Sequence, residues 1–218
     1  MKVFESKNLP VETTSTFSNL IDNDLSLNEK IQLLIDSIDK IKSIPNGEME
    51  LIRILLTKFC GSVYFPRKGD NSERFDAIIS FYEYKVVVEI EIPSTEILDA
   101  PRNLLDDYAV LNCRRASDYT VVPLVICWDL PNRRSDYWNV ISDVYNVLGI
   151  KIKTITILYI ALCYWTNSEL DFRSDDFFLH YNEYSIKSAE QIFERFDIDI
   201  NMLEGYFLSL IHISERAG

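Results

Sequence analysis

Three acidic residues are spaced so that their carboxylates can meet. Glu89 and Glu91 are two residues apart in the β-prone segment 85–92, so their side chains project from the same face of a strand. Asp76 lies in a second β-prone segment, 75–81, and only a tight connection separates the two segments. This pattern predicts a β-hairpin that carries all three acids.

The length of the hairpin loop decides where Asp76 lies. A two-residue loop formed by Tyr82 and Glu83 sets Asp76 directly opposite Glu89, with β-carbons roughly 5 Å apart. A four-residue loop sets Asp76 opposite Glu91 instead, and the three acids still converge. A three-residue loop puts Asp76 on the other face of the hairpin. The register of this hairpin is therefore the main structural question that the sequence raises.

Converging carboxylates repel one another, and a divalent cation removes that conflict. Carboxylate oxygens without a soft ligand nearby suit Mg²⁺ or Mn²⁺, which keep coordination positions for water and a phosphate group. The alternative is that Glu89 and Glu91 form the solvent face of an amphipathic strand. The preceding Val86-Val87-Val88 is apolar on both faces, as in an interior strand. Acids at the end of such a strand are costly to bury, which favours a functional site.

The surrounding sequence predicts a single α/β domain, residues 1–218, with a core at about 48–165. An N-terminal arm (1–25) precedes the core, and a helical part at about 188–213 follows it. Ser26 and Glu29 fit a capping box that opens a helix to about Ile41. The later elements give the order helix, hairpin, helix, strand, helix, strand, and hence a mixed central sheet flanked by helices. Their predicted ranges are 48–60, 75–92, 101–114, 121–128, 135–148 and 154–165.

Composition excludes several classes of function. The chain has 218 residues with 47% hydrophobic and 26% charged residues, as expected for a globular protein. Two histidines and four scattered cysteines disfavour a histidine-based triad or a zinc site, and no phosphate-binding glycine motif is present. The longest apolar run, 155–165, is too short to span a bilayer and is interpreted as a buried strand. Without a signal-peptide pattern, we expect a cytoplasmic protein with no membrane association.

Asp76, a short hairpin and then Glu89-Ile90-Glu91 resemble the signature of the PD-(D/E)xK, or restriction-endonuclease-like, superfamily. The order of elements over slightly more than half the chain is similar to that family's core. The resemblance implies that Asp76 and Glu89 bind metal, assisted by the backbone carbonyl of Ile90. The third motif position would orient or activate the attacking water. Glu91 stands there in place of the usual Lys, and Lys85 lies too far back to replace it.

The resemblance also implies contributions from outside the hairpin. Many family members supply an acid from the preceding helix; Glu50 is the first choice and Glu48 its rival, against a solvated helix face for either. Arg102 follows the motif at the start of a helix, where such nucleases place phosphate contacts; the alternative is an exposed ion pair. Lys68 and Arg74 belong to the basic residues near the site and are further candidates for contact with nucleic acid.

Together, the residues and the resemblance predict a Mg²⁺-dependent endonuclease that hydrolyses DNA, in restriction or another defence role, with Mn²⁺ as a possible substitute. The expected partners are double-stranded DNA and a second copy of the chain. The net charge of −12 raises a variant, in which this chain is a cleavage subunit and a more basic subunit recognises the DNA. The alternative function is a catalytically silent restriction-like domain that serves as an interaction or regulatory module. The sequence does not separate DNA from RNA.

Overall fold

The computed structural model describes residues 17–21, 24–66, 75–92, 96–114, 119–180, 185–198, 203 and 205–207. The chain forms two compact units, Met1–Ile54 and Leu55–Gly218. The expectation of one domain stays a prediction. Residues 17–21 are helical, and the rest of the expected N-terminal arm lies almost wholly outside the described residues.

The first unit is helical and contains the predicted capping box. The Glu29 backbone N–H donates to Ser26 Oγ at 3.3 Å, and the Ser26 N–H donates to Glu29 Oε2 at 2.7 Å. The expected helix to Ile41 is divided at Ser37, whose hydroxyl donates to the Leu33 carbonyl at 2.6 Å and competes with the helical hydrogen bonds. The helices of this part of the chain are α2 (Leu27–Asp36), α3 (Ile38–Ser43) and α4 (Gly47–Leu56).

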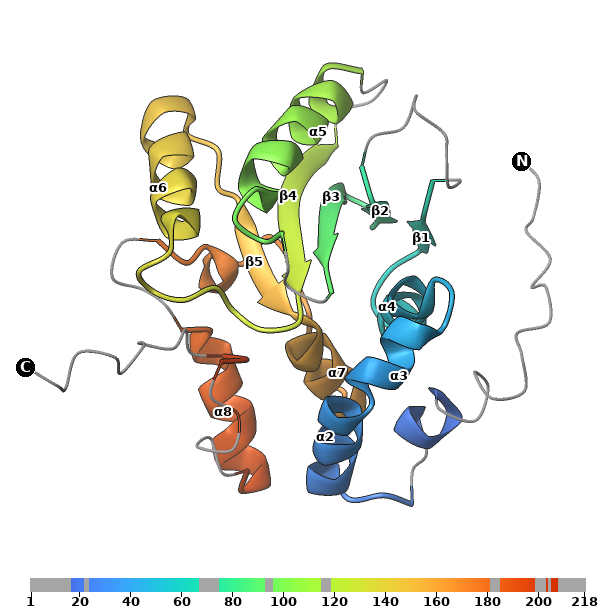
Figure 1. The fold of residues 1–218 in the computed structure, drawn as a ribbon. Coiled ribbons are helices and arrows are strands. Elements are labelled where there is room, and N and C mark those ends of the chain that lie inside the picture. Colours follow the sequence, from blue (N-terminus) through green and yellow to red (C-terminus); the bar gives the residue numbers. More distant parts are fainter. Residues whose placement is uncertain are drawn as a thin grey trace, which may run out of the picture. The chain divides into compact units, whose positions relative to one another are not determined.

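The second unit is built on a five-stranded mixed sheet with the strand order β1-β2-β3-β4-β5 (Figure 1). The first three strands pair antiparallel, whereas β3, β4 and β5 pair parallel. β3 is therefore the middle strand, with neighbours on both sides, as its apolar valine run predicts. The strands are β1 (Ser62–Tyr64), β2 (Ala77–Ser80), β3 (Tyr84–Glu91), β4 (Thr120–Cys127) and β5 (Lys153–Thr156).

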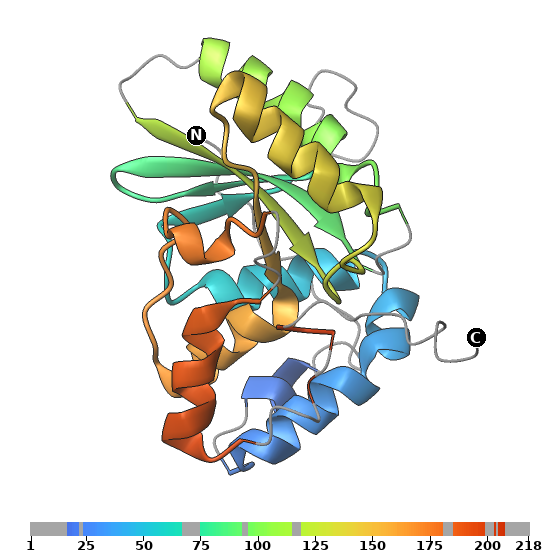
Figure 2. The same cartoon turned by 90° about the vertical axis from the view of Figure 1, so that its left-hand side faces the viewer.

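Helices cover both faces of the sheet, which confirms the predicted fold class. Figure 2 shows α5 (Ala100–Arg114) and α6 (Asp136–Leu148) side by side on one face, and α7 (Ile157–Thr166) and α8 (Lys187–Phe196) on the other side. This arrangement follows from the crossover rule, because α5 and α6 both connect parallel neighbours. α6 ends at Gly149, whose φ of 70° is a left-handed conformation that glycine adopts without strain.

The apolar run at 155–165 is a correction to the sequence analysis. We predicted a strand over 154–165, but only Lys153–Thr156 is extended, and α7 follows immediately. The Thr156 hydroxyl accepts a hydrogen bond from the Tyr159 N–H at 3.4 Å and so caps the helix. The first seven residues of α7 are buried, so this helix lacks the polar face that reveals a helical period. None of the helices in the described segments combines the length and the apolar character needed to cross a bilayer.

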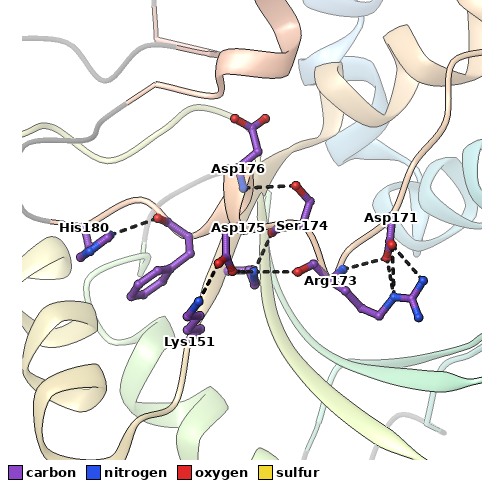
Figure 3. A network of polar contacts seen from close by, with 9 residues as sticks. Lys151, Asp171, Arg173, Ser174, Asp175, Asp176 and His180 are labelled. Atoms are coloured by element: carbon purple, nitrogen blue, oxygen red, sulfur yellow. Dashed lines mark hydrogen bonds and ion pairs between the residues drawn. The ribbon is translucent and has the colours of Figure 1, made fainter.

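A polar network ties the segment after α7 to β5 (Figure 3). The buried Lys153 ammonium donates to the carbonyls of Arg173 and Ser174 at 3.1 and 2.6 Å and to Asp175 Oδ1 at 2.9 Å. The exposed Lys151 donates to Asp175 Oδ2 at 2.6 Å. These contacts occupy all three donors of Lys153, so this lysine is a structural residue.

Candidate metal centre

The hairpin register places Asp76 and Glu89 on the same face. Ala77 pairs with Val88, and the pairing continues to the strand ends with a two-residue connection. The next pair beyond Ala77 is therefore Asp76 with Glu89. This confirms the two-residue alternative and excludes the three- and four-residue loops. The acids lie at the end of the middle strand, where the sheet and α5 shield them.

A backbone hydrogen bond holds Asp76 at this position. The Ile90 N–H donates to Asp76 Oδ2 at 2.8 Å, and Asp76 lies just before the first residue of β2. The N–H and C=O groups of a residue in a hydrogen-bonded antiparallel pair point to the same neighbouring strand. The carbonyl of Ile90 is thus directed toward the edge at which Asp76 lies. This is the group to which the family resemblance assigns a metal contact.

Glu89 and Asp76 line a pocket of about 270 Å³ between the end of β3 and the first turns of α5. Asn103 Nδ2 donates to Glu89 Oε1 at 3.2 Å. The described residues that line the pocket comprise four carboxylates, one guanidinium and one amide: Asp76, Glu89, Asp106, Asp107, Arg102 and Asn103. The pocket is therefore strongly acidic, as a cation site would be.

The environment of Glu89 favours its protonated form. The pKa of Glu89 is raised to about 7, first by burial and then by the negative charge of Asp76; the hydrogen bond from Asn103 acts in the opposite direction. Near neutral pH, this carboxyl is therefore close to half protonated. The repulsion between the two carboxylates that the sequence predicts is thus present in the structure.

Glu91 is oriented differently from the expectation. Its exposed fraction is 9%, and it is not among the described residues that line the pocket. Burial raises the pKa of Glu91, whereas a hydrogen bond from the backbone N–H of Glu96 lowers it. Within the described segments, no three Asp, Glu, His or Cys side chains are arranged to hold one metal ion. The three carboxylates therefore do not converge on one point in this conformation.

The smaller donor set that the resemblance implies fits a divalent cation better. It consists of the carboxylates of Asp76 and Glu89 and the carbonyl of Ile90. All are hard oxygen ligands, and they leave several coordination positions to water and substrate, as Mg²⁺ requires. The metal assignment of these three residues stays a prediction.

Arg102 lines the pocket and takes part in exposed ion pairs. Its guanidinium lies 3.0 Å from Asp136 Oδ2 and 3.4 Å from Asp99 Oδ1. The structure thus shows the salt-bridging alternative for Arg102, and the phosphate contact stays a prediction. Lys85 lies 4.6 Å from the centroid of the Tyr119 ring, in agreement with its exclusion as a substitute for the missing motif lysine.

The structure does not test the other predicted residues of the site. Glu50 forms an ion pair with Arg53, one turn along α4. Glu48 lies in the first turn of the same helix. A role for either acid stays a prediction. Lys68 and Arg74 lie outside the described residues.

Three residues of α5 that line the pocket have no role in the sequence analysis: Asn103, which stands beside Arg102 at the start of the helix, and Asp106 and Asp107, which it does not consider. Their spacing predicts a shared polar surface, because positions i, i+3 and i+4 lie on one face of a helix. Asn103 follows the strand of Glu89 after a short connection, so its helix can pack back over that strand. Asp107 has an exposed fraction of only 5%, which is unusual for an aspartate.

Comparisons with known proteins show a structural likeness. No family model matches the chain, and no curated protein matches it. Among solved structures, the chain is similar to the small subunit of a heterodimeric restriction endonuclease, with 11% sequence identity and a TM-score of 0.45. The match covers 77% of this chain and 90% of that subunit.

Proposed function

We propose that this protein is a metal-dependent nuclease that hydrolyses DNA phosphodiester bonds, with Asp76 and Glu89 as its metal-binding carboxylates. One observation carries most of the weight. Asp76 lies opposite Glu89 at the end of the middle strand, in a pocket where the pKa of Glu89 is raised to about 7. Acids held together in this way destabilise the folded protein, and a bound cation explains why they are there.

We assign a separate role to each residue of the site. Asp76, Glu89 and the Ile90 carbonyl would hold Mg²⁺ or Mn²⁺. The cation would supply a water nucleophile of lowered pKa and positive charge beside the phosphate oxygens. Glu91 is proposed to accept a proton from that water. For this role, its carboxylate must exchange the Glu96 N–H for water.

The charge of the chain bears on its partners. A net charge of −12 and an acidic pocket oppose DNA binding by this chain alone. We therefore favour a cleavage subunit that works with a more basic recognition subunit over a self-sufficient homodimer. A restriction or other defence role in the cytoplasm is the setting that we propose.

The test is cleavage of supercoiled plasmid by the purified full chain with Mg²⁺, Mn²⁺ or EDTA, at a large excess of protein over plasmid so that weak DNA binding by this chain alone does not prevent cutting. The wild type should cut only with metal, whereas Asp76→Asn and Glu89→Gln should reduce cutting by at least about 100-fold. Asp143→Asn is the matched control, because it removes one exposed carboxylate from α6, far along the chain from the hairpin. Equal cutting by the wild type and both hairpin variants would refute the proposal.

The second candidate function is a catalytically silent domain that binds another protein. Glu91 favours it, because this residue replaces the family's Lys, is buried, and is not among the described residues that line the pocket. A silent domain would cut no DNA with any metal, and Mn²⁺ would not raise its melting temperature. A metal-induced rise in melting temperature that Glu89→Gln abolishes would argue for the nuclease.

A further inference from the structure

Glu89 has a hydrogen-bond donor on the opposite wall of the pocket. Asn103 lies in the first turns of α5, and its Nδ2 donates to Glu89 Oε1 at 3.2 Å. The backbone fixes the place of this donor, because the Asn103 N–H bonds to the Asp99 carbonyl at 3.1 Å as the helix begins. The amide is therefore presented by a rigid element.

We propose that Asn103 is a positioning residue that fixes Glu89 Oε1 and thereby leaves Glu89 Oε2 available for a divalent cation in the pocket. This inference rests on the proposed function, since it assigns a role around the same carboxylate. A carboxylate has about four acceptor directions on two oxygens, so one oxygen can hold the amide while the other binds metal.

The Asn103 amide is an uncharged donor, which suits a site that binds a cation. A lysine or arginine in this position would neutralise Glu89 and compete with the cation for its charge. An amide orients the carboxylate and leaves the full negative charge in place. The guanidinium of Arg102, the cation that lines the described part of the pocket, contacts Asp99 and Asp136.

The acids around Glu89 make an orienting donor necessary. Asp76 lies across the hairpin, and Asp107 approaches from α5; the charges of both act on Glu89. Repulsion from two sides drives the Glu89 carboxylate away from the pocket toward other rotamers. The hydrogen bond from Asn103 opposes that rotation. Loss of such a supporting contact typically weakens metal binding by about 10- to 100-fold.

The test compares two asparagines of the same helix in the full-length protein. Mn²⁺ affinity is measured by titration calorimetry for the wild type, Asn103→Ala and Asn112→Ala. Asn112 is the matched control, because it lies nine residues further along α5 and does not line the described pocket. Asn103→Ala should weaken Mn²⁺ binding by about 10- to 100-fold, whereas Asn112→Ala should change it less than about twofold.

Two further measurements separate positioning from a merely structural role. The metal-free melting temperature of Asn103→Ala should stay close to that of the wild type, because the higher helix propensity of alanine offsets the loss of one hydrogen bond. The Mg²⁺ concentration for half-maximal cleavage should rise, while the rate at saturating Mg²⁺ stays within about threefold of the wild type. Asn103→Leu, which fills the space without a donor, should weaken metal binding at least as much as Asn103→Ala.

The outcomes distinguish this inference from the proposed function. If the wild type binds Mn²⁺ and cuts DNA but Asn103→Ala binds Mn²⁺ as tightly, only the role of Asn103 is refuted. If the wild type binds no metal, both ideas fail together. A fall in melting temperature with unchanged metal affinity would make Asn103 a structural residue and overturn the inference.

Discussion

Asp76 and Glu89 face each other across the β2–β3 hairpin, and the Ile90 N–H, 2.8 Å from Asp76 Oδ2, holds the aspartate in place. Glu89 lies within β3, and Asp76 directly precedes β2, so the strands and the Ile90 N–H together fix both acids. A site built on strands keeps its ligands in place more accurately than a site built on loops. The repulsion within this pair should be measurable in the metal-free protein.

Removal of the charge of Glu89 should stabilise the metal-free protein. The pKa of Glu89 rises from 4.5 to about 7 on folding, so the folded state favours the protonated carboxyl, and ionisation destabilises it. Glu89→Gln should therefore increase the free energy of unfolding above about pH 7 by about 1–2 kcal/mol, after allowance for partial exposure. Urea unfolding in EDTA measures this difference.

The pH dependence provides the control for that prediction. Below the unfolded pKa of 4.5, the carboxyl is protonated in both states, so the advantage of Glu89→Gln should vanish. The advantage should grow as the pH rises from 4.5 to 7 and then stay constant. A pH-independent gain would mean that glutamine stabilises the site by packing and that Glu89 has an ordinary pKa.

Metal binding should release protons near neutral pH. A cation needs the ionised carboxylate, and Glu89 with a pKa of about 7 is close to half protonated at that pH. Mn²⁺ affinity should therefore rise about tenfold per pH unit below about pH 6.5 and level off above about pH 8. Calorimetry in two buffers of different ionisation enthalpy counts the protons, and Glu89→Gln should lose both the binding and the release.

The sequence predicts this pair well because the hairpin is local. The two-residue connection of Tyr82 and Glu83 sets the register, and a slip by one residue would carry Asp76 to the face opposite Glu89. The same reasoning fails for the pocket wall on α5. Contact between Asn103 and Glu89 depends on how the helix crosses the sheet, and residue spacing within either element does not reveal that crossing.

Two other differences have local causes that hydrophobic patterns do not show. In α7, apolar residues surround the whole helix, so a helix and a buried strand have the same pattern. The useful signal is Thr156, which caps α7 with its hydroxyl. In the first unit, the predicted helix is divided at Ser37, whose N–H donates to the Leu34 carbonyl at 3.1 Å, three residues back, in a tighter turn than the α-helix makes.

Glu91 should affect the chemical step more than metal binding. Its carboxylate is nearly buried and lies outside the described lining of the pocket, so it contributes little to a cation held by Asp76 and Glu89. Glu91→Gln should reduce the cleavage rate by at least about tenfold and change Mn²⁺ affinity less than about threefold. A rate equal to that of the wild type would remove Glu91 from the mechanism. A large loss of Mn²⁺ affinity would instead make it a metal ligand.

The two lysines that contact Asp175 should differ in their importance for stability. Lys153 has a side-chain exposed fraction of 5% and satisfies two carbonyls and a carboxylate. The side chain of Lys151 is 37% exposed, contacts the carboxylate and lies over the Tyr145 and Phe178 rings. Lys153→Met leaves those acceptors without their donor and should lower the free energy of unfolding by about 2–3 kcal/mol. Lys151→Met, the matched control, should lower it by less than about 1 kcal/mol.

Mn²⁺ affinity should stay unchanged in both variants, because neither lysine lines the pocket described around Glu89. Equal losses of stability in urea unfolding would show that Lys153 contributes no more than an exposed ion pair.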